Sequence, residues 1–129
     1  MSDKDQKFYA AWARLLEWMR EYAAEREGVR FVKQADFTEY IYRMERPKAL
    51  PTTIMSASLS SGDDPVLFVS VAQQHDTFRE VALNPFGSHV RRTLTSDASG
   101  EHLAEGRRLF TRDMLFELAD RLFETAAAV

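Results

Sequence analysis

The histidines are the first residues to consider for chemistry, and there are three: His75, His89 and His102. Their separations of fourteen and thirteen residues match none of the short spacings that place two imidazoles on one helix face around zinc. A carboxylate can orient an imidazole, as Asp76 would for His75, but adjacent side chains on a strand diverge. His89 follows Ser88 without the Gly-x-Ser-x-Gly turn of a nucleophilic serine. We interpret His75 and His89 as polar residues beside strands.

Other common sources of catalysis are also missing. The chain has no cysteine, which removes thiolate nucleophiles, cysteine-ligated zinc and iron–sulfur clusters. It contains neither of the two common glycine-rich phosphate loops. Asp63 and Asp64 lack the alternating oxygen ligands of a calcium-binding EF-hand and are typical of a turn. The sequence therefore predicts no catalytic residue, no metal site and no cofactor.

Arginine provides the most suggestive charge pattern. Residues 79–112 hold six arginines against four acidic residues, inside a chain whose net charge is −3. A guanidinium group grips a carboxylate or a phosphate through two parallel hydrogen bonds. We expect the end of the last strand and the start of the closing helix to gather five candidate partner-binding residues: Arg91, Arg92, Arg107, Arg108 and Arg112. The plainer alternative is a solvated charged face.

A row of serines gives a second candidate site. Small polar residues on one sheet face leave room for a ligand or a peptide, and tyrosines from a neighbouring strand can form the walls. The predicted groove consists of Ser56, Ser58 and Ser70, with Tyr40 and Tyr42 as walls. The alternative is the solvent face of an ordinary amphipathic strand.

Long helices are predicted at both ends of the chain. Residues 6–27 place apolar side chains at alternating spacings of four and three, and Gly28 stands where a glycine would end a helix. Trp18 widens this apolar stripe and is a candidate partner contact. The closing helix gathers apolar residues from Leu109 onward, and Thr111 can act as an N-cap for a fresh start there.

Strands fill the middle of the chain. Residues 29–46 fit a strand or a helix, and β-forming residues favour the strand. Pro47 and Pro51 should end either element. Strands are then expected at 52–60, 66–73, 78–83 and 89–95, and the strand at 66–73 is apolar on both faces and should be central.

These elements predict one α+β domain over residues 1–129, with an antiparallel meander sheet of four to five strands flanked by N-terminal and C-terminal helices. The strands should pair antiparallel because parallel pairing needs long crossover connections, whereas the turns between these strands are short. Two helices on one face leave the other face of the central strand uncovered. A homodimer, through that face or through Trp18, would cover it. In size, charge and layout the chain resembles bacterial secretion chaperones, and no motif carries that resemblance further.

Composition and charge bound the function. With 45% hydrophobic and 29% charged residues the chain should fold, and no apolar run reaches the length of a membrane span. No secretory signal is visible, so we expect a soluble cytoplasmic protein with no membrane contact. Thirteen arginines against four lysines suit a GC-rich bacterial source.

We therefore predict a small non-catalytic binding or adaptor protein that contacts itself and an unidentified protein. One alternative is a small-molecule or enzymatic pocket on the open sheet face, with His75, His89 or Arg91 among its polar groups. The other is a nucleic-acid-binding regulator that uses the arginine cluster.

Overall fold

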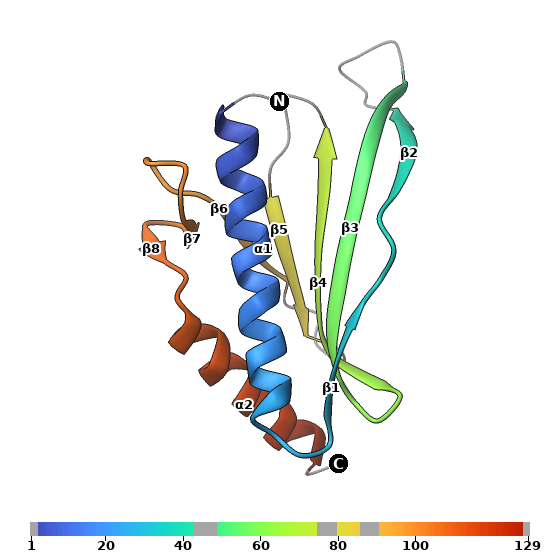
Figure 1. Ribbon diagram of the computed structural model, residues 1–129, viewed down its shortest axis with the longest axis vertical. Coiled ribbons are helices and arrows are strands. Elements are labelled where there is room, and N and C mark those ends of the chain that lie inside the picture. The colour runs from blue at the N-terminus through green and yellow to red at the C-terminus, as the bar shows by residue number, and fades with distance from the viewer. Residues whose placement is uncertain (1–2, 43–48, 75–79, 86–90, 128–129) are drawn as a thin grey trace.

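The computed structural model describes residues 3–42, 49–74, 80–85 and 91–127. In these residues, one helix precedes eight strands along the sequence and a second helix follows them (Figure 1). The helices are α1 (Asp3–Ala24) and α2 (Arg112–Ala127), and the strands are β1 (Val29–Lys33), β2 (Phe37–Tyr42), β3 (Ala49–Ser61), β4 (Asp64–Gln74), β5 (Glu80–Pro85), β6 (Arg92–Ser96), β7 (Leu103–Glu105) and β8 (Arg108–Leu109). The α+β class is confirmed, whereas the predicted count of four to five strands is too low.

The strands form one antiparallel sheet in the order β1-β3-β4-β5-β6-β7-β8, and β2 pairs with β3 beyond the end of β1. Apart from the two segments that share the β3 edge, each strand lies beside the next in the sequence, as a meander requires. β4 lies between β3 and β5, so the prediction of a central strand at 66–73 is confirmed. β8 is the last strand in the order, and its outer edge has no neighbouring strand among the described residues.

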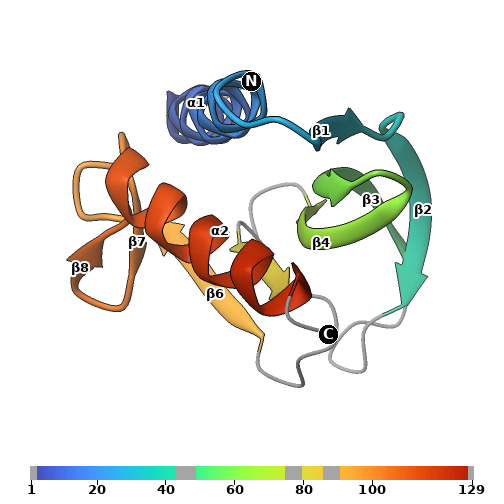
Figure 2. The same cartoon turned by 90° about the horizontal axis from the view of Figure 1, so that it is seen from below.

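Both helices cover the same face of the sheet. Cross-strand partners share a face, and Leu59 pairs with Leu67 while Leu83 pairs with Arg92. The leucines belong to the core that also buries the inward face of α1, which consists of Phe8, Ala11, Trp12, Leu15, Met19 and Tyr22. Arg92 faces Met114 and Leu118 of α2 across a small cavity. Seen from below, α2 lies between α1 and β6 (Figure 2).

Several predicted boundaries need correction. α1 ends at Ala24, so Gly28 does not close it but stands at the entry to β1 with a φ of 80°. The segment at 29–46 is extended, as favoured, but it forms two strands over its described part. Pro51 lies inside β3 instead of ending an element. Among the described residues, β4 pairs with β3 only as far as Thr52, so the described partner of Pro51 is Tyr40 of β2, and a position that pairs on one side tolerates proline.

The closing helix begins later in the sequence than expected. Residues 103–109 form the β7–β8 hairpin, and α2 begins only at Arg112. The alternative start at Thr111 is the correct one, because the Thr111 hydroxyl accepts a hydrogen bond from the backbone N–H of Met114 at 3.3 Å. None of the described helices is long and apolar enough to cross a membrane.

Candidate interaction surface

The candidate interaction surface is formed by the β7–β8 hairpin and the adjacent part of α1. Gly106 has a φ of 61°, a left-handed conformation that glycine adopts without strain, and it turns the chain between the two strands. Leu103 and Phe110 are buried, and the Phe110 N–H donates to the Leu103 carbonyl at 2.9 Å. Leu109, between these anchored positions, keeps 45% of its surface exposed. The fold therefore holds an apolar side chain at the surface on a short fixed strand.

A cavity of about 330 Å³ lies between this hairpin and α1. Its apolar lining comes from Ala11 and Trp18 of α1 and from Leu103, Leu109 and Phe110. We call it the hairpin cavity. Arg14, His102 and Arg112 also line it, so its walls are apolar with nitrogen-bearing side chains among them. A space of this kind suits an apolar side chain with an acidic group beside it.

Arg14 holds the loop that borders the hairpin cavity. Its two terminal nitrogens both donate to the Glu101 carbonyl at 3.3 Å, and one lies 3.2 Å from Nδ1 of His102. Arg14 makes no ion pair with any residue that the structure describes.

Arg112, by contrast, is a structural residue. Its Nε donates to Glu21 at 2.7 Å and its Nη2 to Glu25 at 3.3 Å, both on α1. The guanidinium also lies 4.0 Å from the centre of the Phe116 ring. Arg112 thus fastens the first turn of α2 to α1, and its charge is largely offset.

Arg92 is also occupied within the fold. It makes a two-pronged contact with Glu105, with Nε and Nη2 donating at 2.8 and 2.7 Å. This hydrogen bonding lowers the pKa of Glu105 below its ordinary value. Glu105 thus occupies one edge of the guanidinium and offsets its charge.

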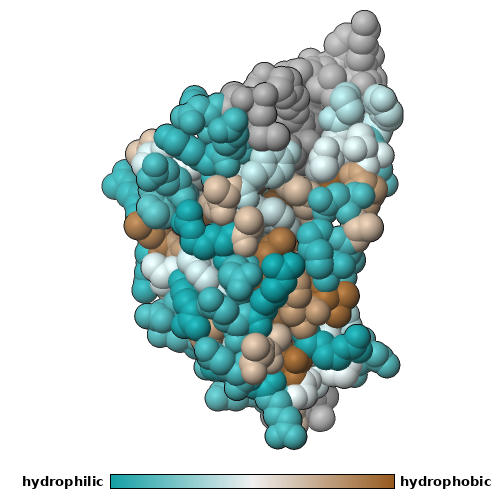
Figure 3. Space-filling model, viewed as in Figure 1, coloured by the Kyte–Doolittle hydropathy of each residue, from teal (hydrophilic) through white to brown (hydrophobic). Residues whose placement is uncertain are grey.

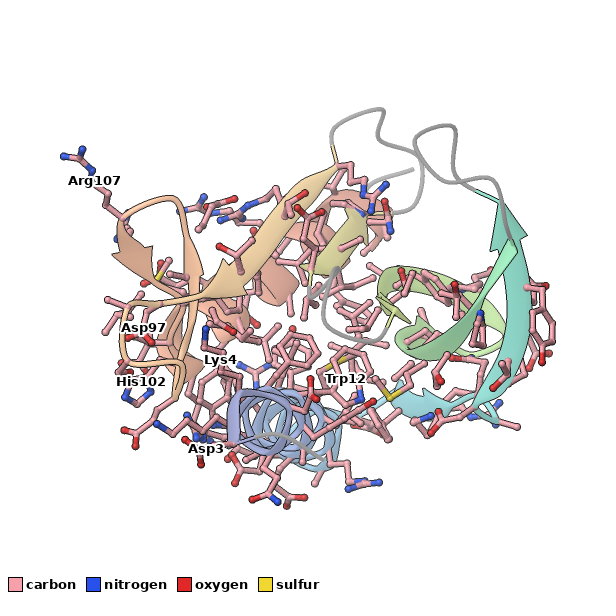
Figure 4. All side chains as sticks on the ribbon, turned by 90° about the horizontal axis from the view of Figure 1, so that it is seen from above. Asp3, Lys4, Trp12, Asp97, His102 and Arg107 are labelled. Atoms are coloured by element: carbon pink, nitrogen blue, oxygen red, sulfur yellow. The ribbon has the colours of Figure 1, made fainter. Side chains whose placement is uncertain are left out.

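The other three arginines of the predicted cluster are exposed. Arg91 precedes β6, while Arg107 and Arg108 stand at the tip of the hairpin, and none of the three makes an ion pair with another described residue. Figure 4 shows Arg107 extending away from the rest of the chain. Arg92 and Arg108 share a cavity of about 180 Å³ with Arg121. The structure thus brings Arg92 close to Arg108 but places Arg112 beside the hairpin cavity.

The predicted serine groove is not assembled as expected. Ser56 pairs with Ser70 and Tyr40 pairs with Pro51. Side chains alternate along β3, so Tyr40 shares a face with Pro51 and Thr53, opposite to the face of the serines. Ser56 and Ser58 are only 5% and 3% exposed, while Ser70 is half-buried. The register therefore separates Tyr40 from the serines.

The backbone of Tyr42, the second predicted wall, pairs with Ala49. His75 and His89 lie outside the described residues. His102 is exposed beside Arg14, close to Asp97 at the same end of the molecule (Figure 4). Among the described residues, no group of three or more histidines and acidic side chains is placed to hold a metal ion.

A second cluster, at the opposite end of α1, joins the two helices. The Asp120 carboxylate of α2 accepts hydrogen bonds from the Tyr22 hydroxyl at 2.8 Å and from Nε of Arg26 at 3.0 Å. Both hydrogen bonds hold the pKa of Asp120 below its ordinary value. Burial raises the pKa of Tyr22, and the hydrogen bond to Asp120 raises it further. We call these three residues the helix clamp.

The helix clamp borders a cavity of about 580 Å³, whose lining includes four carboxylates and Arg26. All polar groups of the clamp are engaged with one another, so we assign it to stability.

Trp18 and Arg112, both predicted as partner contacts, line the hairpin cavity, and Arg112 is paired within the fold. Leu109 was placed in the closing helix, because a two-residue strand leaves no periodic signal. Arg14 was not predicted as a site residue. Its contact with Glu101 spans 87 positions, and no local pattern encodes such a contact.

Comparison with known proteins gives a result over almost the whole chain. The model of the family "NADH-quinone oxidoreductase chain 15" matches residues 3–126. A protein of Thermus thermophilus, NADH-quinone oxidoreductase subunit 15, is 42% identical over 127 residues, which cover 98% of this chain and 97% of the relative. A bacterial relative agrees with the bacterial source that the arginine excess predicts. The chain belongs to the NADH-quinone oxidoreductase chain 15 family.

Proposed function

We propose that this chain is a non-catalytic subunit of an NADH-quinone oxidoreductase and that it acts through contacts with other subunits. The observation that carries the proposal is the similarity, along nearly the full chain, to a protein named as subunit 15 of that enzyme. Because the match covers both proteins almost completely, a shared role in the assembly is the simplest consequence. The adaptor role predicted from sequence becomes that of a subunit.

The surface supports a role in binding. Three large hydrophobic side chains of the described part are well exposed: Phe37, Tyr40 and Leu109. Phe37 and Tyr40 lie on β2, at the opposite end of the sheet order from Leu109 on β8. Apolar residues and arginine are enriched at protein interfaces, whereas isolated exposed apolar residues are common on any surface. It is the combination of Leu109 with the hairpin cavity and nearby arginines that favours a protein partner.

The proposal is tested by purification in both directions from the organism that encodes the chain. An affinity tag on this chain should recover the oxidoreductase subunits, and a tag on another subunit should recover this chain in a fixed ratio. Recovery of this chain free of the enzyme in both experiments would show that it is not a subunit.

The non-catalytic part of the proposal needs a separate measurement. In a strain that lacks the chain, each assembled enzyme should transfer electrons from NADH to quinone at the rate of the complete enzyme, although the yield of assembled enzyme can fall. Loss of turnover in enzyme whose other subunits are all present would contradict this, and restoration by added chain would assign it a part in the reaction.

Self-association remains a separate prediction for the isolated chain. Trp18 is half-buried at the hairpin cavity, where a second copy could contact it. Light scattering over a dilution series should give a dimer mass for the wild type and a monomer mass for Trp18→Glu, with Tyr40→Glu as the control. A wild-type monomer at every concentration would end the homodimer hypothesis. An unchanged dimer mass in Trp18→Glu would place the contact on the sheet.

A cytoplasmic location is also part of the proposal. An acidic chain with no cysteine has no need of an oxidising compartment. Protease treatment of intact and of opened cells tests the location, since a cytoplasmic chain should be degraded only after the cells are opened.

A further inference from the structure

The hairpin cavity has the composition of a site for one or two side chains of another protein. Its volume of about 330 Å³ lies at the lower end of the range of about 300–1,000 Å³ that is typical of ligand sites. Trp18 is half-buried and Leu109 is 45% exposed, so both can lose more surface to a partner. At interfaces, tryptophan, tyrosine and arginine side chains in well-packed pockets contribute most of the binding energy.

Charge selects the kind of partner. The segment from Gly106 to Arg112 contains three arginines and no acidic residue. Of these, Arg112 is paired with Glu21 and Glu25, but Arg107 and Arg108 have no ion pair among the described residues. Arg14, on the wall of the cavity, makes no ion pair with any described residue. In a chain of net charge −3, the segment from Gly106 to Arg112 is therefore locally positive between the flanking Glu105 and Asp113.

The exposed apolar group and these arginines lie together. Leu109 directly follows Arg107 and Arg108 in the hairpin and lines the same cavity as Arg14. On the face seen in Figure 3, which is mostly hydrophilic, a hydrophobic spot lies over β8 at the left edge. Apolar and cationic groups in this arrangement complement a segment with an apolar side chain between carboxylates.

We propose that the hairpin cavity receives an apolar side chain from an acidic segment of another subunit of the oxidoreductase, with Leu109 as the main apolar contact and Arg14, Arg107 and Arg108 as its charged surroundings. This inference rests on the proposed function and adds to it the surface and the chemistry of the partner. Beside Phe37 on β2, by contrast, the neighbouring described cation Lys33 is paired with Asp36.

The test measures binding of the full chain to oxidoreductase purified from a strain that lacks it. Leu109→Ala should weaken binding about fivefold to tenfold, since it removes half-exposed apolar surface that the partner buries. Leu109→Glu should weaken it by at least tenfold, because it also brings a carboxylate against an acidic segment. The matched control is Tyr40→Glu, which changes a more exposed residue on the opposite edge.

Salt separates the charged part of the contact from the apolar part. Wild-type affinity should fall as KCl is raised from about 50 to about 300 mM, because ions screen exposed charges over this range. The double variant Arg107→Gln/Arg108→Gln should bind more weakly at low salt and show a flatter dependence. Leu109→Ala should lower the affinity at every salt concentration without changing the dependence, and Arg30→Gln is the control for loss of an exposed arginine. Circular dichroism of each variant checks that the fold is kept.

A photo-crosslinking amino acid at position 109, incorporated into the chain in the assembled enzyme, identifies the occupant. We expect linkage to one subunit, at a segment with an apolar residue between acidic ones, and no linkage to that segment from position 40. A linked segment that is basic, or that belongs to a second copy of this chain, would overturn the proposal.

The outcomes distinguish this inference from the proposed function. If the wild-type chain binds the enzyme but the variants at 107, 108 and 109 bind equally well, the surface is wrong and the function stands. If the wild-type chain does not bind and does not co-purify, the proposed function itself is wrong.

Discussion

Removal of the Asp120 carboxylate tests whether the helix clamp holds α2 against α1. Tyr22 is 1% exposed, and its hydroxyl donates to Asp120 at 2.8 Å. In Asp120→Ala this buried hydroxyl loses a charged acceptor, which costs about 1.5–3 kcal/mol. The ion pair with Arg26 adds little, about 0.2–1 kcal/mol, because the Asp120 side chain is 47% exposed and water screens the charges. The expected loss is about 2–3 kcal/mol of the free energy of unfolding.

The size of the effect should follow the hydrogen bond more than the charge. Asp120→Asn keeps an oxygen that can accept from Tyr22, so its cost should be smaller, about 1 kcal/mol. Tyr22→Phe removes the donor and leaves an exposed carboxylate that water can solvate, so its cost should also be about 1 kcal/mol. The double variant Tyr22→Phe/Asp120→Ala should lose less free energy of unfolding than the sum of its two single variants, with a coupling energy of about 1 kcal/mol.

Urea unfolding followed by circular dichroism at neutral pH measures these differences. Glu117→Ala is the matched control, because Glu117 is an exposed carboxylate on α2 that makes no hydrogen bond or ion pair with another described residue. Its change should stay within about 0.5 kcal/mol. Equal losses in Asp120→Ala and Glu117→Ala, or strictly additive losses at Tyr22 and Asp120, would refute the reasoning.

Acid provides an independent check on the same carboxylate. Its folded pKa lies below the ordinary value of 3.8, so in mild acid the unfolded chain binds the proton first. The stabilisation is therefore complete above about pH 5 and is lost as the pH falls through the lowered pKa. The gap in stability between wild type and Asp120→Ala should accordingly narrow toward pH 3. A gap that stays constant would mean that ionisation of Asp120 does not contribute to stability.

Three further variants test other contacts. Glu105→Gln should lower the free energy of unfolding by about 1 kcal/mol at neutral pH and by less near pH 3, because Arg92 lowers the pKa of Glu105 and stability that depends on the carboxylate is lost in acid. Urea unfolding at both pH values measures the two losses, and equal losses would contradict this reasoning. Thr111→Ala should cost about 1 kcal/mol by removing the N-cap of α2, whereas an unchanged thermal midpoint would show that the cap is dispensable. Gly106→Ala should cost about 1–2 kcal/mol because of its φ of 61°, and Gly106→Asn should recover part of the loss; equal stability of both variants with the wild type would argue against a left-handed turn.

Long elements with a strong period could be predicted from the sequence. The stripe from Phe8 to Tyr22 defines α1 because burial on one face requires that spacing. The apolar run at 66–73 identifies β4 as a central strand, because a strand in the middle of a sheet is more fully buried than one at its edge. In both cases a local pattern of side chains is a direct consequence of what the element packs against.

Short elements could not be predicted. β7 and β8 have three and two residues, fewer than any period needs, and they exist because Leu103 and Phe110 are anchored in a core assembled by distant segments. The expectation that Pro51 ends a strand was wrong for a related reason. Proline is excluded only where its missing N–H would pair, and whether β3 has one neighbour or two at that position depends on where β4 stops.

The candidate surface was only partly visible for the same physical reason. Five arginines in one region indicated a charged surface, but the sequence did not show which of them would be neutralised. Arg112 pairs with Glu21, 91 positions away, and Arg92 with Glu105, 13 positions away. The arginines that remain available are known only once these contacts are known.

Their contacts divide five arginines of the chain into one group that affects stability and one that affects binding. Arg26, Arg92 and Arg112 each donate to a carboxylate of another element, so their loss should lower the free energy of unfolding. Arg107 and Arg108 make no such contact among the described residues, so their loss should leave unfolding unchanged. If they serve the contact of this subunit with its neighbours, their loss should instead weaken binding. A variant series in which stability and affinity change independently would therefore support both the assignment of the paired arginines to the fold and that of the exposed ones to the interface.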